Sequence, residues 1–171
     1  GKTIDNDIEG IQSFGFYSAV EETSKFIKNA YYESISMNCI VFIETMGRKS
    51  GKLAQYSTVA CDNYVDLCII SENNESSDKY VELIQNIHRI KNHGVIVISE
   101  NYDREKILTE LQVPYKVLIP GYFVRSGEPN VVDRISCVKM CKRAFIDSPS
   151  NGSFDSYLIF VKSNMVGMIS V

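Results

Sequence analysis

The chain has 171 residues, of which 44% are hydrophobic and 23% are charged, and its net charge at pH 7 is −3. This length allows one compact domain with its own core, and the charge gives no basic surplus for binding nucleic acid or an anionic membrane surface. The sequence shows no apolar run as long as a membrane span and no signal peptide, so we expect a cytoplasmic protein with no nucleic-acid and no membrane partner.

Helical and strand patterns alternate along the chain. The first predicted helix begins after Ser13, a typical N-cap residue, and a later helix is expected to end just before Gly94. In chain order, the predicted elements are a helix (14–32), a strand (39–43), a helix (52–61), a strand (67–70), a helix (from 76 or 77 to 90), a strand (95–98), a short helix (104–111), a strand (115–119), a helix (131–145) and a hairpin (157–161 with 165–171).

The predicted strands are apolar throughout and are separated by helices. This pattern indicates an α/β fold, a three-layer sandwich whose mostly parallel sheet is covered by helices on both faces. Ligands of such sheets bind beyond the carboxyl ends of the strands. Polar clusters follow three predicted strands, at residues 46–48, 99–101 and 121–125. We therefore expect these clusters to form one site for an anion and a sugar.

Two carboxylates lie near the start of the chain. Asp5 and Asp7 are two residues apart and lie beside Lys2 and Thr3. One carboxylate can accept a proton from a hydroxyl group while its neighbour holds a hydrated Mg²⁺, which is the chemistry of phosphoryl transfer. An Asp-Asn-Asp run is also typical of turns and helix caps. The polar clusters at the strand ends favour the phosphoryl-transfer interpretation.

The five cysteines are Cys39, Cys61, Cys68, Cys137 and Cys141. Their odd number and their place in apolar runs predict buried thiols in a reducing compartment and no disulfides. Cys137 and Cys141 are one helical turn apart and could suggest a metal pair. Neither histidine has an obvious reason to join them, so core packing is the preferred interpretation.

Taken together, the motifs resemble those of the 6-phosphofructokinase family over nearly the whole chain and in the same order. The matching residues are Thr-Ile-Asp-Asn-Asp at 3–7, Phe-Gly-Phe at 14–16, Met-Gly-Arg-x-Ser-Gly at 46–51, the strand-end glutamate Glu100, and two arginines nine residues apart, Arg125 and Arg134, with Asp133 before the second.

The resemblance implies phosphoryl transfer from ATP or pyrophosphate to the 1-hydroxyl of fructose 6-phosphate, giving fructose 1,6-bisphosphate, with Mg²⁺ as the cofactor. It implies a catalytic group in which Asp5 is the general base, Asp7 positions Mg²⁺, Thr3 contacts the transferred phosphoryl group and Arg48 stabilises charge in the transition state. It further implies sugar contacts from Met46, Gly47 and Glu100, phosphate-side contacts from Tyr122, Arg125 and Arg134, and a donor contact from Lys2. Arginine forks suit phosphate oxygens and carboxylates suit sugar hydroxyls.

Lys2 and the Gly-Tyr-x-x-Arg form at residues 121–125 are similar to the pyrophosphate-using enzymes and to their ATP-using plant and trypanosomal relatives, so the donor stays open. The resemblance implies that residues 1–171 are the sugar-phosphate-binding and catalytic half of a longer subunit, incomplete at both ends and without the donor-binding half, and therefore inactive alone. The full-length protein is expected to be a homo-oligomer, a dimer or a tetramer. The alternative is a non-catalytic regulatory half that binds a sugar phosphate or an effector; the presence of Asp5 and Asp7 favours catalysis.

Overall fold

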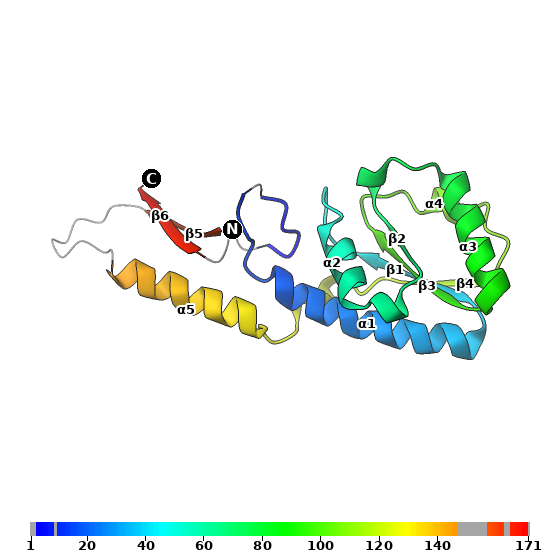
Figure 1. Cartoon of the computed structure of the whole chain (residues 1–171), viewed down its shortest axis with the longest axis horizontal. Coiled ribbons are helices and arrows are strands. Elements are labelled where there is room, and N and C mark those ends of the chain that lie inside the picture. The colour runs from blue at the N-terminus through cyan, green and yellow to red at the C-terminus, as the bar shows by residue number, and fades with distance from the viewer. Residues whose placement is uncertain (1–2, 9, 147–156, 163–164, 171) are drawn as a thin grey trace.

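Helices and strands alternate along most of the chain in the computed structural model, which describes residues 3–8, 10–146, 157–162 and 165–170 (Figure 1). The elements are α1 (Phe16–Met37), β1 (Ile40–Thr45), α2 (Lys52–Ala60), β2 (Leu67–Ile69), α3 (Ser77–Lys91), β3 (Gly94–Ser99), α4 (Glu105–Leu108), β4 (Tyr115–Leu118), α5 (Val131–Ile146), β5 (Tyr157–Lys162) and β6 (Met165–Ser170). Short 3₁₀ turns are η1 (Asp62–Tyr64), η2 (Ser71–Asn73) and η3 (Gly121–Arg125).

The central sheet has four strands in the order β2-β3-β1-β4, and each neighbouring pair is parallel. Strand β1 lies inside the sheet, where Val41 pairs with Val95 of β3 and with Lys116 of β4. All six residues of β3 are buried, as expected for a parallel strand covered on both faces. The predicted α/β fold with a parallel sheet is confirmed.

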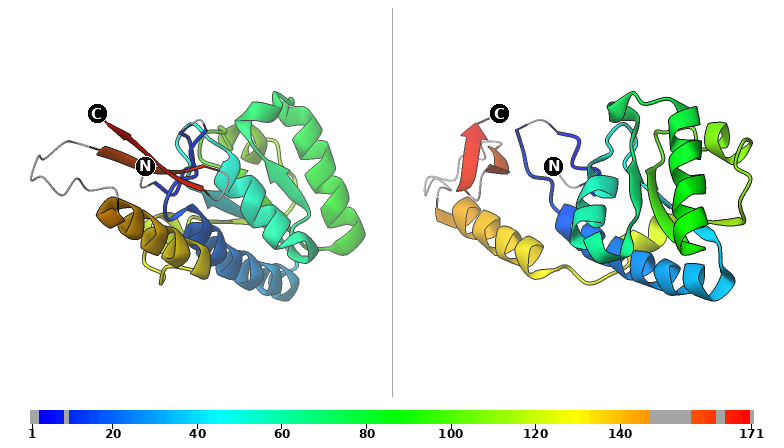
Figure 2. Two further views of the ribbon diagram at one scale, coloured as in Figure 1. Left: turned by 60° about the vertical axis from the view of Figure 1, so that its left-hand side comes forward. Right: turned by 45° about the vertical axis from the view of Figure 1, so that its right-hand side comes forward.

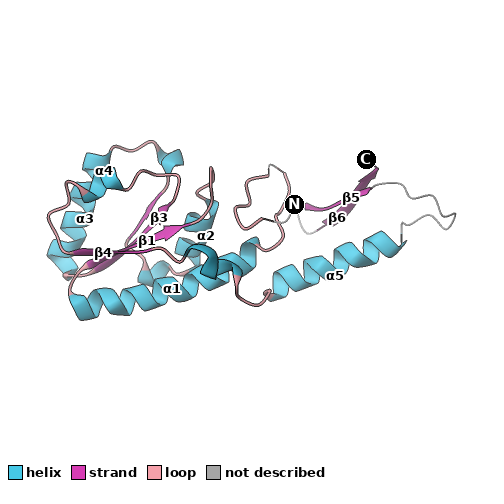
Figure 3. Cartoon of the chain, turned by 180° about the vertical axis from the view of Figure 1, so that it is seen from behind, coloured by secondary structure: helices cyan, strands magenta, loops and turns pink. Residues whose placement is uncertain are grey.

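Alternate residues of the strands pack against two different helical layers. Val41 and Ile43 of β1 face a cluster that includes Ile27 of α1 and Ala54 of α2. Their neighbours Ile40 and Phe42 face the opposite cluster, to which α3 and α4 contribute Val81, Ile84 and Ile107. Figure 3, which shows the molecule from behind, has α1 lying along one face of the sheet. The three layers therefore follow from the period of two along each strand.

Several boundaries differ from the sequence-based predictions. Helix α1 continues beyond residue 32 to Met37 and ends where Asn38 takes the left-handed conformation, with φ of 48°. Helix α3 likewise ends at Asn92, with φ of 59°, while Gly94 is already the first residue of β3. Asparagine tolerates the left-handed conformation, so Asn92 ends α3 in place of Gly94, the glycine predicted to follow the helix. The predicted helix over 104–111 is confined to Glu105–Leu108.

Helix α5 and the β5–β6 hairpin lie beyond the N-terminal end of α1 (Figures 1 and 2). The hairpin is antiparallel and pairs Tyr157 with Ser170, which confirms the predicted pairing of the two β-like runs. Residues 163–164 between the strands, and residue 171, lie outside the described residues. None of the helices in the described part of the chain is long and apolar enough to cross a membrane.

Candidate active site

The loop after β1 has a backbone conformation that few residues tolerate. Gly47 has φ of 157°, and a Cβ atom at this position would come within 2.2 Å of the Ser50 carbonyl oxygen. Arg48 follows with φ of 53°, in the left-handed region. The Ser50 N–H donates to the Gly47 carbonyl at 2.9 Å and closes the turn. A non-glycine residue in this region is strained, so other contacts must hold Arg48 in place.

Glu100 supplies those contacts from the carboxyl end of β3. Its Oε1 accepts the Gly47 N–H at 2.8 Å and also the Arg48 N–H. Its own N–H donates to the Thr45 carbonyl at 2.9 Å, which fixes Glu100 at the end of the β1–β3 ladder. The structure therefore brings three predicted site residues together and directs the Glu100 carboxylate at the loop that carries Arg48.

A second carboxylate, Glu72, holds the other end of this loop from η2. Its Oε1 accepts the Gly51 N–H at 2.6 Å, at the start of α2. Burial opposes ionisation of Glu72, but the hydrogen bonds from Gly51, from its own N–H and from Asn101 and Ser71 outweigh it and hold the pKa of this carboxyl below its usual value. Sequence reasoning missed Glu72, although it follows the strand over 67–70 as Glu100 follows β3.

The N-terminal segment carries Asp5 into the same region of the molecule. Asp5 is 5% exposed, its N–H donates to Thr3 Oγ1 at 3.1 Å, and its Oδ1 has no hydrogen-bond partner among the described residues. Lys52, in the first turn of α2, donates from Nζ to the Asn6 carbonyl at 2.8 Å. Asp7, in contrast, is exposed.

An apolar cluster places this segment beside the β1 loop. Ile4 and Met46 both pack against the buried group Phe16, Ala19, Val20 and Leu53. Because Met46 directly follows β1 and Leu53 lies in α2, the Thr3–Asn6 segment lies at the carboxyl edge of the sheet. The predicted neighbourhood of Asp5 and the Arg48 loop agrees with this packing.

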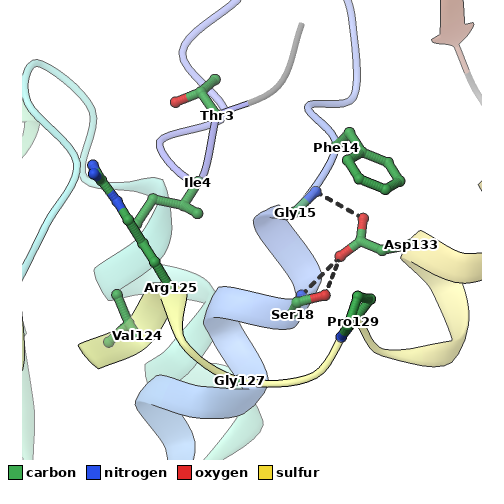
Figure 4. A pocket seen from close by; sticks show the side chains of 10 residues that line it. All are labelled: Thr3, Ile4, Phe14, Gly15, Ser18, Val124, Arg125, Gly127, Pro129 and Asp133. Atoms are coloured by element: carbon green, nitrogen blue, oxygen red, sulfur yellow. Dashed lines mark hydrogen bonds between the residues drawn. The ribbon is translucent and has the colours of Figure 1, made fainter. Parts of the chain in front are cut away.

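A cavity of about 350 Å³ opens between the N-terminal segment, α1 and the chain after η3. Thr3, Ile4 and Arg125 lie on one side of it in Figure 4, and Asp133 lies on the other. The Arg125 guanidinium stacks over the Tyr122 ring, 5.0 Å from its centroid. A cationic fork thus shares a cavity with the Thr3 hydroxyl group.

Apart from Thr3 and Arg125, none of the predicted site residues that the structure describes lines this cavity. Those outside its lining are Asp5, Asp7, Met46, Gly47, Arg48, Glu100, Tyr122 and Arg134, and the last two are exposed. Lys2 lies outside the described residues. The prediction that Cys137 and Cys141 pack in a core is wrong, because both are exposed on α5. Partial desolvation raises the pKa of the Cys137 thiol, and the nearby Cys141 adds to the effect.

The N-terminus of α1 is capped by a residue that sequence reasoning assigned no structural role. Ser13, the predicted cap, makes no side-chain cap bond; its N–H donates to Asn6 Oδ1 at 2.9 Å. Asp133 instead accepts the Gly15 N–H at 2.9 Å and the Ser18 N–H at 3.0 Å. The contact joins residues 118 positions apart, so no local sequence signal could have revealed it.

Comparisons with known proteins identify relatives in sequence and in fold. ATP-dependent 6-phosphofructokinase 1 of Arabidopsis thaliana is 43% identical over 84% of this chain and 38% of its own length, and the ATP-dependent 6-phosphofructokinase of Trypanosoma brucei brucei is 33% identical over 84% and 36%. Among solved structures, Saccharomyces cerevisiae phosphofructokinase superposes with a TM-score of 0.77 at 25% identity, covering 98% of this chain and 24% of that one. The pyrophosphate-dependent phosphofructokinase of Nitrosospira multiformis shares the fold, with a TM-score of 0.78 at 17% identity, covering 98% of this chain and 49% of that one.

The chain thus spans 38% and 36% of the length of these two curated relatives. The sequence model of the family described as phosphofructokinase matches residues 1–146, which include the Asp5 segment, the Arg48 loop, Glu100 and Arg125. This chain belongs to the phosphofructokinase family.

Proposed function

We propose that this chain provides the sugar-phosphate side of an enzyme that transfers a phosphoryl group to the 1-hydroxyl of fructose 6-phosphate, giving fructose 1,6-bisphosphate in glycolysis. The observation that carries the proposal is the buried Asp5 carboxylate, whose Oδ1 has no hydrogen-bond partner among the described residues. Buried polar atoms are almost always paired, so this unpaired carboxylate oxygen is a candidate to receive a substrate hydroxyl.

Asp5 acts as the general base in this proposal. Its backbone is fixed by the bond to Thr3 Oγ1 and by the packing of Ile4, so the carboxylate is held before substrate arrives. A positioned base accepts the proton from the attacking hydroxyl as the bond to phosphorus forms. Thr3, two residues away, contacts the phosphoryl group that is transferred.

The loop of Met46, Gly47 and Arg48 completes the reacting centre. Glu100 uses Oε1 to hold this loop, which leaves Oε2 to accept a sugar hydroxyl. Arg48, whose backbone is held in a strained conformation, supplies a guanidinium to stabilise the charge that develops on the phosphoryl oxygens. Such preorganised cations stabilise the transition state more than the ground state.

The 6-phosphate of the sugar is bound by Arg125, with Tyr122 and Arg134 as further contacts. Arg125 lines the cavity beside Thr3, and the Tyr122 ring supports its guanidinium plane. A guanidinium fork binds two phosphate oxygens at once. Arg134 follows Asp133 on α5 and is exposed, so its contact depends on an approach of the phosphate to the first turn of α5.

The carboxylates fit a magnesium ion of the kind that phosphoryl transfer uses. No group of three or more His, Cys, Asp or Glu residues that could enclose a metal is found among the described residues. Mg²⁺ usually takes only one or two carboxylates and completes its shell with water and substrate phosphates, which suits the exposed Asp7. When bound there, the ion would neutralise charge on the donor phosphates. Asp7 would hold the ion, and Asp5 would remain the base.

We propose ATP as the donor, with Lys2 on the donor side. The relatives at 33% and 43% identity are ATP-dependent by name, whereas the pyrophosphate-dependent structure at 17% identity supports the fold alone. Assays with ATP and with pyrophosphate in turn decide between the donors.

Light scattering on the full-length protein tests the proposed homo-oligomer. Two Arabidopsis relatives are named chloroplastic, so a cytoplasmic location stays a prediction that cell fractionation would test.

The deciding experiment is Asp5→Asn in the full-length enzyme. Asn cannot accept the hydroxyl proton, so kcat should fall about a hundred- to ten-thousandfold while the KM for fructose 6-phosphate changes little. Asp62→Asn is the matched control, because Asp62 is an exposed carboxylate in η1, in a different loop. Unchanged kcat in the Asp5 variant would remove the base assignment and favour the alternative of a regulatory half.

A further inference from the structure

The cap on α1 belongs to a closed network of hydrogen bonds that joins the start of α1 to the start of α5. Asp133 is 1% exposed, and its Oδ1 accepts the Gly15 N–H while its Oδ2 accepts the Ser18 N–H and the Ser18 hydroxyl (Figure 4). Ser18 Oγ in turn accepts the Asn130 N–H at 3.0 Å, and Asn130 Oδ1 accepts the Asp133 N–H at 3.0 Å. We call these four residues, Gly15, Ser18, Asn130 and Asp133, the α1–α5 junction.

The chain that leads from Arg125 into the junction is also held against α1. At Gly127, a Cβ atom would lie 2.2 Å from Glu22 Cδ, so the backbone here runs close to the Glu22 side chain in the second turn of α1. Val124, on the other side of Arg125, is 5% exposed. Arg125 is therefore fixed between a buried anchor and a segment that lies on α1.

The junction also lies next to the part of the chain that follows Thr3 and Asp5. That segment leads into α1, whose first turn the junction fixes. Thr3 and Arg125 line one cavity and come from parts of the chain that are joined through this first turn. The distance between the phosphate-binding arginine and the catalytic segment thus depends on the junction.

Asp133 has an electrostatic effect too. The N-terminus of a helix presents free N–H groups and a partial positive charge, which together bind phosphate readily. In this chain the carboxylate of Asp133 already occupies those N–H groups next to the cavity. A phosphate that enters the cavity is thereby directed to Arg125 and away from the helix end.

We propose that Asp133 and Ser18 are positioning residues for sugar-phosphate binding: through the α1–α5 junction they set Arg125 against the Thr3–Asp5 segment and keep the α1 N-terminus from competing for the phosphate. The inference rests on the proposed function, because it assigns the two residues to the same binding site. Neither residue needs to touch the substrate.

Ser18→Ala tests this with little risk to the fold, because it keeps both backbone bonds to Asp133 and removes only the hydroxyl. Titration of the full-length protein with fructose 6-phosphate, well below the unfolding temperature, should show an affinity about three- to tenfold weaker for Ser18→Ala. It should show a loss of more than about tenfold for Asp133→Asn, whose amide group would face a backbone donor. Ser18→Thr, which keeps a hydroxyl, should restore the parent affinity.

Two controls separate positioning from loss of stability. Ser24→Ala removes a hydroxyl of the same helix that bonds only back to Val20 O, and Ile84→Val loosens the core on the other face of the sheet. Both should bind fructose 6-phosphate as the parent does, even where Ile84→Val lowers Tm as much as Ser18→Ala. Hydrogen exchange at the Gly15 and Ser18 amides should rise about tenfold or more in Asp133→Asn and stay unchanged in Ser24→Ala.

The outcomes are distinguishable. Parent and junction variants that bind fructose 6-phosphate equally well would overturn the inference and leave the proposed function standing. A full-length parent protein that does not bind fructose 6-phosphate would overturn the proposed function, and the inference with it. Unchanged exchange at Gly15 and Ser18 in Asp133→Asn would show that the junction does not exist in solution.

Discussion

Replacing Glu100 by Ala and by Gln should test how this carboxylate holds the Arg48 loop. Oε1 accepts the Gly47 and Arg48 N–H groups, while Oε2 is the oxygen that we propose accepts a sugar hydroxyl. Ala removes the acceptor of both backbone bonds. Gln keeps an oxygen for them but loses the charge and places an amide group where Oε2 was.

The expected loss of stability follows from these bonds. A hydrogen bond to a charged group contributes about 1.5–3 kcal/mol when buried, but Glu100 is exposed, so we take about 1 kcal/mol for each bond. Glu100→Ala should therefore cost about 2 kcal/mol. Glu100→Gln should cost about 1 kcal/mol, because a neutral acceptor remains. The left-handed Arg48, whose conformation has its own cost, has no other side chain bonded to its N–H among the described residues.

Urea unfolding measures both values. The chain has no Trp, so unfolding is followed by far-ultraviolet circular dichroism. With a slope of about 2 kcal/mol/M, the midpoint should fall by about 1 M for Ala and about 0.5 M for Gln. Glu110→Ala, at an exposed carboxylate after α4, is the control and should not move the midpoint. If Glu100→Ala unfolds with the parent midpoint, Glu100 does not hold the Arg48 loop and the reasoning fails.

Three further predictions concern single residues. Gly47→Ala should destabilise the chain by more than about 1 kcal/mol in the same urea assay, because its Cβ would lie 2.2 Å from Ser50 O; an unchanged midpoint would contradict the loop geometry. The pKa of Glu72 is lowered in the folded chain, so the ionised carboxylate stabilises the fold at neutral pH and this contribution is lost as pH falls through the folded pKa. The difference in urea midpoint between the parent and Glu72→Gln should therefore shrink below about pH 4, and a difference that stays constant with pH would refute this linkage. Arg125→Ala should weaken fructose 6-phosphate binding more than Arg134→Ala, since only Arg125 lines the described cavity; calorimetric titration showing the reverse order would move the phosphate to α5.

Most of the fold could be predicted because it depends on patterns that are local in sequence. Apolar runs such as residues 39–43 and 95–98 can be buried only in a covered parallel sheet, and the structure pairs β1 with β3 in this way. Helix ends were less predictable, since a left-handed Asn38 or Asn92 terminates a helix as well as a glycine does. Cys137 and Cys141 were misjudged because helical spacing does not say which side of α5 is covered.

The candidate site was predictable in part for the same reason. Strand-end logic identified Arg48 and Glu100, whose bonding the structure shows, and it could also have identified Glu72. It could not reveal that Asp133 replaces Ser13 as the cap of α1, since that contact depends on how α5 meets α1 in three dimensions. The catalytic and binding roles of these residues remain predictions that the kinetic and titration experiments address.

The bonds that assemble the site close very long loops, which has a consequence for the order of folding. Gly47 and Glu100 are 53 residues apart, and Ser18 and Asp133 are 115 apart. Closing such loops costs chain entropy before any contact is gained, so parallel sheets and distant caps form late, whereas α1 and α3 depend on near neighbours and can form early. A partly folded chain can therefore hold native helices while it has neither wall of the cavity in place. On the proposed function, a nascent chain should therefore gain affinity for sugar phosphate only after residue 133 has left the ribosome.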